Sequence, residues 1–296
     1  ALSSNSSPMA AQSLAYAYLD LWDWKRAAHY LDLAVELNPN NVELRGNRAF
    51  LALRMGDYDK GWPHFAEVLA EIDDPTNPQG AQRLRRHLGT EKVWRGTDLT
   101  DKHLLIWCEH GLGDCLMMAR YIPLIREQFG FCRITLLAPE ALCRLFAASS
   151  MGEIIDINAC PNGPDFDYAA HSSIMALPHI FHSAGHRNIP STVPYLAIPK
   201  PAAAQWQEKL AEIKGIKVGL IWAGNPKNEK DALRSIPLTD YAALFELPGL
   251  TFISLQKGTP AAQIANSKLP VLNLMADCHD MLDTGALIQC LDLVIS

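Results

Sequence analysis

Short apolar runs alternate with helix-like segments from about residue 101 onward, and this alternation limits the possible folds more than any other feature. The runs KHLLIWCE (102–109) and CRITLLAP (132–139) are bounded by polar residues, as buried strands are. Between them, DCLMMARYIPLIREQFG (114–130) has apolar residues at helical spacing and ends on Gly130, a helix stop signal. Alternating strands and helices predict a parallel sheet covered by helices on both faces.

The same rhythm begins again after a proline-rich stretch. IPSTVPYLAIPKP (189–201) is typical of a crossing between domains, and IKVGLIWAG (216–224) starts a second series of strands. We therefore expect two Rossmann-type α/β domains. The last residues, DLVIS (292–296), have the pattern of a buried strand with nothing after it. This indicates that the chain is a fragment and that its second α/β domain is incomplete.

A glycine turn with an acid after it joins the first expected strand to the following helix. Gly111 and Gly113 permit a tight turn, and the amides at a helix N-terminus attract anions. The third glycine of the dinucleotide-binding fingerprint is absent, because Cys115 and Leu116 lead directly into Met117. Asp114 has two interpretations at this point, a catalytic carboxylate or a routine helix cap.

A polar loop with several cations follows the first strand of the second α/β region. Gly224 and Asn225 open the loop, and Lys227, Lys230 and Arg234 follow. Open α/β sheets bind ligands at the strand ends, and an arginine fork can hold two oxygens of a diphosphate. The alternative is a solvated basic loop. The segment SLQKG (254–258) ends the next strand and is expected to line the same crevice.

The N-terminal region repeats with a period of 34 residues, a shift that places Trp22 on Gly56 and Ala27 on Gly61. Alternating small and large positions suit a helix-turn-helix repeat, and the pattern resembles the tetratricopeptide repeat. The second unit departs from it, with Gly61 for the usual alanine and Asp73 where proline is expected. Two unrelated amphipathic hairpins are the alternative. In the next segment, AQRLRRHLG (81–89), the charged residues predict a solvated helix surface.

Composition excludes several classes of protein. The net charge of −6 argues against binding to a nucleic-acid backbone. The seven cysteines are scattered without a CxxC pair and the ten histidines show no HxxxH spacing, so we expect neither a disulfide framework nor a metal site. A reducing, cytoplasmic setting fits such cysteines. No apolar run approaches the roughly 18 residues of a membrane span.

Together these motifs resemble a bacterial family that joins tetratricopeptide repeats to a glycosyltransferase region of the GT-B type. The resemblance rests on VWRGTDLTDKHLLIWCEHGLGDCLMMARYIPLI, FDYAAHSSIMALP, IPSTVPYL, VGLIWAGNP, RSIPL, SLQKG and DTGALIQCLDLVIS. The glycosyltransferase region is also similar to the heptosyltransferases of glycosyltransferase family 9. The overall domain plan is similar to that of the O-linked N-acetylglucosamine transferases. The resemblance implies helical repeats over residues 1–90, an acceptor-side α/β domain over 91–200 and a nucleotide-sugar-side domain over 201–296.

The resemblance also implies roles for individual residues. Asp114 would be the general base, in an acceptor-side turn with His110, Gly111 and Gly113. A second set of residues would bind the donor, namely Asn225, Lys230, Arg234 and Gln256. The donor would be a nucleoside-diphosphate sugar, with no metal or other cofactor, and the repeats would hold a protein or glycan acceptor. In the family, an Asp-Thr turn and a His-bearing helix that grip the donor follow the strand matched by DLVIS.

Two other functions stay open. The chain would be a non-catalytic interaction module if the repeats were a scaffold attached to a degenerate sugar-nucleotide fold. A Rossmann-type dehydrogenase is disfavoured by the missing third glycine. Met117 and Met118 also replace a Gln-Phe pair that is common after this turn in the repeat-linked family.

Overall fold

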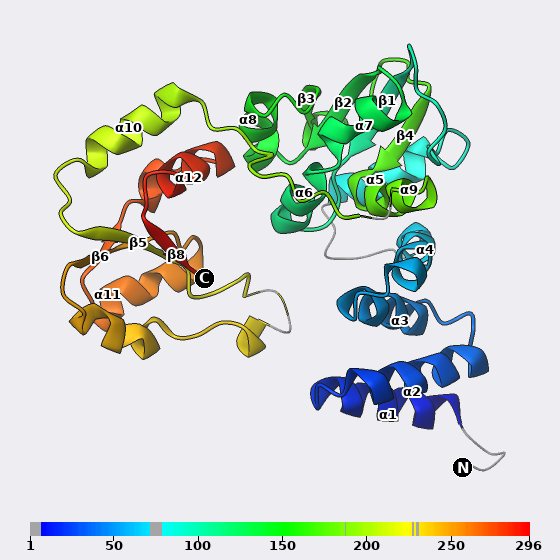
Figure 1. The fold of residues 1–296 in the computed structure, drawn as a ribbon, viewed down its shortest axis with the longest axis horizontal. Helices are drawn as coiled ribbons and strands as arrows, with labels where there is room; N and C mark the ends of the chain where they lie inside the picture. Colours follow the sequence, from blue (N-terminus) through cyan, green and yellow to red (C-terminus); the bar gives the residue numbers. More distant parts are fainter. Residues whose placement is uncertain (1–6, 72–78, 187, 227, 229–230) are drawn as a thin grey trace. The chain divides into compact units, whose positions relative to one another are not determined.

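A computed structural model describes residues 7–71, 79–186, 188–226, 228 and 231–296. The chain divides into two compact units (Figure 1). The first unit comprises residues 1–139 and 151–192, and the second comprises residues 140–150 and 193–296. The boundary at 192–193 therefore falls inside the proline-rich stretch.

The first unit begins with two helical hairpins of the same length. They are formed by α1 (Pro8–Asp20), α2 (Trp24–Leu37), α3 (Val42–Arg54) and α4 (Tyr58–Glu71). Both helices of the second hairpin begin and end 34 residues after their counterparts, from Pro8 to Val42 and from Trp24 to Tyr58. The predicted period is thus the period of the helices themselves.

The repeat positions also correspond in backbone conformation. Trp22 and Gly56 occupy the same place between paired helices, with φ of 59° and 78°. Glycine adopts this left-handed conformation freely, whereas a tryptophan costs about 1 kcal/mol there. Gly61 lies where the first hairpin has the buried Ala27, and a Cβ at Gly61 would come within 2.4 Å of a Leu53 methyl group. The departure from alanine therefore makes room for Leu53.

The rest of the first unit is built on a four-stranded parallel sheet in the order β3-β2-β1-β4. The strands are β1 (His103–Trp107), β2 (Arg133–Ala138), β3 (Glu153–Asp156) and β4 (Ala170–Ser173). The helices of this part are α5 (Gln79–Leu88), α6 (Leu112–Ala119), α7 (Ile122–Phe129) and α9 (Leu177–Ser183), with short 3-10 turns η1 (Ile157–Ala159) and η2 (Ile174–Ala176). Leu84 and Leu88 of α5 pack with Leu105 and Trp107 of β1.

The prediction of one helix over 114–130 is wrong. The segment forms two helices, α6 and α7, separated at Arg120 and Tyr121. Pro123 lies in the first turn of α7, where its missing N–H is tolerated, but it cannot continue a helix from before. Gly130 ends α7 with φ of 93°, as its position predicted.

The second unit contains another parallel sheet, in the order β7-β6-β5-β8. Its strands are β5 (Ile216–Leu220), β6 (Leu250–Ser254), β7 (Val271–Asn273) and β8 (Leu293–Ile295). Its helices are α8 (Glu140–Ala148), α10 (Lys200–Leu210), α11 (Gln263–Ser267) and α12 (Met281–Ile288), with 3-10 turns η3 (Asp231–Leu233), η4 (Leu238–Glu246), η5 (Thr259–Ala262) and η6 (Met275–Asp277). The two sheets thus have the same strand order.

Both faces of the second sheet are covered by side chains. One buried cluster joins Trp206 of α10 and Leu287 of α12 to Ile253 of β6. Another joins Leu220 of β5 to Leu238, with Phe245 of η4 packed against it. In each sheet the next two strands are added on one side of the first strand, and the last strand is added on its other side. The direction of strand addition therefore reverses between β1 and β4 in one sheet and between β5 and β8 in the other. Such a switch point is where open α/β sheets bind ligands.

Candidate functional site

The glycine turn begins at the switch point of the first sheet, between β1 and β4. The ladder register pairs Trp107 with Ser173, so the residues after Trp107 lie at the carboxyl ends of β1 and β4. His110 has a left-handed backbone with φ of 64°, and Gly111 is the residue that precedes α6. A left-handed conformation costs a residue other than glycine about 1–2 kcal/mol, and such residues occur in structural turns as well as at active sites, as Trp22 shows. The turn therefore meets the positional criterion for a site.

Asp114 lies in the first turn of α6 and is partly exposed. The Gly111 N–H donates to Asp114 Oδ2 at 3.1 Å, so the carboxylate does cap the helix. A Cβ at Gly113 would have nothing within 4 Å, which leaves open space beside the turn. The capping bond occupies one carboxylate oxygen, and capping is compatible with a further role for Asp114.

Glu109, which the sequence analysis did not single out, is the most buried acid of this turn. Its side chain is 0% exposed. Ser173 Oγ donates to Oε1, and Arg85 Nη2 donates to Oε2 at 2.8 Å. The prediction of a solvated charged face on residues 81–89 is therefore wrong for Arg85, because its guanidinium turns inward to a buried carboxylate. The side chain of Arg83 lies outside the described residues.

His171, in the middle of β4, is 4% exposed, and burial lowers the pKa of its imidazole. At pH values just below about 6.5, the ordinary pKa of histidine, the unfolded chain therefore binds more protons than the folded chain. We expect the stability conferred by neutral His171 to be complete above about pH 6.5 and to decline as the pH falls below it, by at most about 1.4 kcal/mol per pH unit. Urea unfolding from pH 5 to 8 measures this, and the decline should be smaller in His171→Leu. Equal slopes in the two proteins would exclude His171 as its source.

The polar loop after β5 lies at the switch point of the second sheet. Gln256, a predicted donor-binding residue, is 4% exposed, and its amide binds the protein backbone. Its Oε1 accepts from Trp222 N at 3.1 Å and Ala223 N at 2.9 Å, and its Nε2 donates to Lys257 O. In this structure Gln256 fixes the start of the loop. Of the predicted donor-binding residues, Lys230 lies outside the described residues, as does Lys227.

Arg234 lies against the loop glycine. Its Nε donates to Asp231 Oδ1 at 3.1 Å, and the Arg234 side chain is 56% exposed. A Cβ at Gly224 would lie 2.6 Å from Arg234 Nη2 and 2.4 Å from Asp231 Oδ1. A side chain at position 224 would therefore displace Arg234 or Asp231. Ser235 completes the loop by accepting from Gly224 N and donating to Asp231 Oδ2. Asn225, also predicted here, is exposed at the same loop.

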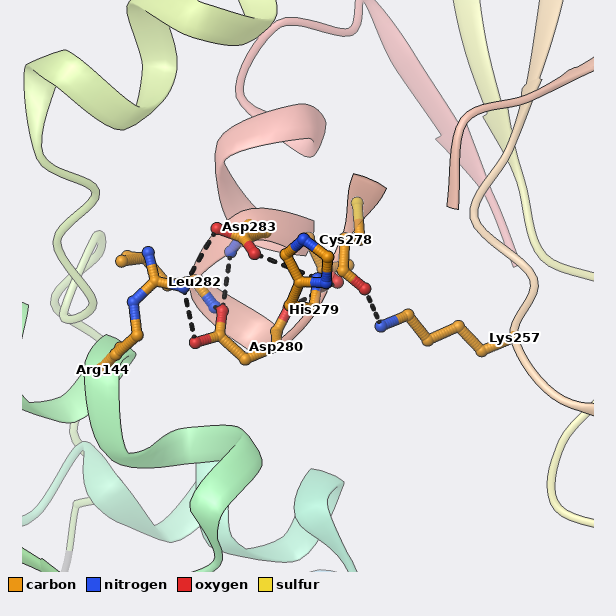
Figure 2. A network of polar contacts seen from close by, with 8 residues as sticks. Arg144, Lys257, Cys278, His279, Asp280, Leu282 and Asp283 are labelled. Atoms are coloured by element: carbon orange, nitrogen blue, oxygen red, sulfur yellow. Dashed lines mark hydrogen bonds and ion pairs between the residues drawn. The ribbon is translucent and has the colours of Figure 1, made fainter. Parts of the chain in front are cut away.

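A polar network surrounds the start of α12 (Figure 2). Asp280 caps the helix, and Arg144 Nη1 donates to Asp280 Oδ2 at 2.9 Å and Asp283 Oδ1 at 3.2 Å. Lys257, from the predicted SLQKG segment, donates from Nζ to the Cys278 carbonyl at 2.5 Å. These contacts attach α8 and the segment after β6 to the start of α12.

The described residues contain no group of three or more His, Cys, Asp or Glu side chains placed to hold a metal ion. All seven cysteines are free thiols. In the part of the chain that was searched, no helix is both long and apolar enough to cross a membrane.

The two switch-point sheets place the chain among mixed α/β proteins with a glycosyltransferase-like fold. The crystal structure of a glycosyl transferase family 9 protein from Veillonella parvula superposes with a TM-score of 0.50, over 68% of this chain and 77% of that one, at 12% identity. An O-GlcNAc transferase variant from Thermobaculum terrenum aligns over 90% of this chain and 67% of its own at 12% identity, but its TM-score of 0.24 supports no conclusion.

One curated protein adds a relationship at the level of sequence. Protein FlbA of Caulobacter vibrioides is 25% identical over 319 aligned positions, which cover 95% of this chain. The chain spans 50% of the length of that relative. No family model matches the chain.

Proposed function

We propose that the chain is part of a glycosyltransferase that moves a sugar from a nucleoside-diphosphate donor to a hydroxyl acceptor. The observation that carries the proposal is that the glycine turn after β1 and the polar loop after β5 each lie at a sheet switch point. The fold of the chain is also similar to that of a family 9 glycosyltransferase. Asp114 serves as general base, with His110, Gly111 and Gly113 forming the acceptor-side turn. As in a GT-B enzyme, the first α/β region serves the acceptor and the second serves the donor.

On the donor side, Arg234 receives the diphosphate next to Gly224 and Asn225. An exposed guanidinium beside a loop glycine can donate to phosphate oxygens and stabilise the charge of the leaving nucleotide without a metal. Asp231 holds the guanidinium in place before the donor binds. Lys230 adds a further positive charge to this loop, and Gln256 acts on the donor indirectly by fixing the loop backbone.

The helical hairpins serve as tetratricopeptide repeats that hold a protein or glycan acceptor. The 34-residue spacing of the helices and their buried small residues support this assignment. A cytoplasmic location is supported by the seven free thiols, since disulfides are rare in reducing compartments. A bacterial source is supported by the similarity to the protein from Caulobacter vibrioides.

Calorimetric titration with a panel of nucleoside-diphosphate sugars tests the proposal. Selective micromolar binding of one donor is the expected result. Absence of binding by the folded protein would favour the alternative of a repeat scaffold with a non-catalytic α/β region. Such a scaffold would also have the bond of Gln256 to the backbone and the pair between Arg234 and Asp231.

Arg234→Ala is expected to weaken the binding of the nucleoside-diphosphate sugar by about 1–3 kcal/mol, the scale of a charge-assisted hydrogen bond. The same titration measures the loss, with Lys209→Ala as the control because Lys209 is a half-exposed cation on α10 of the same unit. Equal affinities for wild type and Arg234→Ala would remove this residue from the donor site.

A further inference from the structure

Glu109 is a fully buried carboxylate that the proposed chemistry does not use. It follows Cys108, whose N–H still bonds to Leu137 O, so Glu109 sits where β1 leaves the sheet. Both of its oxygens are engaged, Oε1 by Ser173 at the end of β4 and Oε2 by Arg85 of α5. Three elements from separate parts of the sequence thus meet at one side chain.

Arg85 is held in this position from a second side. Its guanidinium carbon lies 5.5 Å from the centre of the Trp107 ring, and the Arg85 side chain is 26% exposed. A planar arginine fork between an aromatic face and a carboxylate has a defined orientation, which lysine does not reproduce. A buried ion pair is weak evidence for stability, because desolvation offsets much of its attraction, but it can select one conformation over others.

The conformation selected here is that of the glycine turn. The Glu109 carbonyl accepts from Cys115 Sγ at 3.3 Å, and Cys115 N donates to the Gly111 carbonyl at 3.1 Å. Glu109 is therefore fixed by its side chain to β4 and α5, and by its carbonyl to the first turn of α6. His110, with its left-handed backbone, lies between these attachments. Asp114 projects from the same helical turn.

We infer that Arg85 and Glu109, with Ser173, form a positioning device that holds the turn carrying Asp114. Glu109 acts through the backbone of the turn and is not a catalytic residue. The structural part of this inference is independent of the reaction. Its consequence for sugar transfer rests on the proposed function. A misplacement of about 1 Å at a reacting group can lower a rate by about 100-fold, so the position of this turn has a large effect on a base at Asp114.

Hydrogen exchange of the backbone amides tests the inference without any substrate. Arg85→Met removes the cation and leaves Glu109 unpaired, and Arg86→Met is the matched control on the exposed side of the same helix. We expect the amides of Gly111 and Cys115 to exchange at least about tenfold faster in Arg85→Met, because both are bonded within the turn. The control and the amides of β5 should be unchanged. Wild-type exchange at Gly111 and Cys115 in Arg85→Met would overturn the inference.

Two further variants cover the case in which Arg85→Met does not fold. Arg85→Lys keeps the charge without the fork, and the double variant Arg85→Met/Glu109→Gln removes both charges together. Arg85→Lys should loosen the turn measurably while the protein stays folded. The double variant should fold at least as well as Arg85→Met, because no buried charge is left unpaired. A folded Arg85→Lys with wild-type exchange in the turn contradicts the inference.

Kinetics separate this inference from the proposed function. If the protein transfers sugar, Arg85→Lys should lower kcat by about tenfold or more while the KM for the donor stays within about twofold, since positioning at the reacting centre affects the rate. Loss of donor affinity with unchanged kcat would contradict a positioning role. If no sugar transfer is found in the wild type, the proposed function fails, whereas a loosened turn in Arg85→Lys still supports the structural inference.

Discussion

Asp114→Asn is expected to lower the rate of sugar transfer by about 100- to 10,000-fold, the range that general acid–base catalysis contributes. Asparagine has almost the same shape, and its side-chain oxygen can still accept the Gly111 N–H that caps α6. Its amide cannot take a proton from an attacking hydroxyl. Donor affinity should stay within about twofold, because the Arg234 loop belongs to the other unit. The measurement is kcat with the donor that calorimetry identifies.

Two controls separate catalysis from helix capping at Asp114. Glu127→Gln removes a carboxylate from the exposed side of α7 in the same unit and should leave the rate unchanged. Asp114→Ala also removes the bond to the Gly111 N–H and should cost about 0.3–1 kcal/mol of stability beyond the effect on rate. If Asp114→Asn turns over at the wild-type rate, Asp114 is a helix cap and another residue must activate the acceptor.

The parts of the fold that depend on local patterns were predictable. The apolar runs became β1 and β2, Gly130 ended α7, and the 34-residue period gave helices that repeat with that spacing. In each case neighbouring residues carry the information, since strand burial, a positive φ and helix periodicity are local properties. The one local error, a single helix over 114–130, came from giving Pro123 less weight than the apolar spacing around it.

The parts of the site that depend on distant contacts were not predictable. Arg85 and Glu109 are 24 residues apart and Ser173 is 64 residues from Glu109, so no spacing rule brings them together. The Gln256 amide oxygen accepts from backbone groups 34 and 33 residues earlier, and sequence spacing does not predict these bonds either. The available signal was a charged residue, Glu109, at the end of a buried apolar run. Such a residue needs a partner, although the sequence does not say which one.

Trp94→Ala is expected to destabilise the first unit by about 3–5 kcal/mol, the usual cost of truncating a large buried aromatic residue. Trp94 is 2% exposed, its ring meets Phe129 edge to face at 4.9 Å between centroids, and its Nε1 donates to Thr97 O. Its backbone N–H bonds to the carbonyl of His171, so it also attaches the segment before β1 to β4. Loss of the ring would therefore open a cavity beside the strand that ends at Ser173.

Hydrogen exchange in the β1 amides gives this loss for the first unit alone, since the two units need not unfold together. Trp94→Phe keeps an aromatic ring against Phe129 and loses the bond to Thr97, so it should cost less than Trp94→Ala. Asp114→Asn should change the rate at constant stability, and Trp94→Ala should change stability at a distance from the turn. A loss of less than about 1 kcal/mol in Trp94→Ala would mean that the site collapses to fill the cavity, because the cost of truncation depends on how far the surroundings relax.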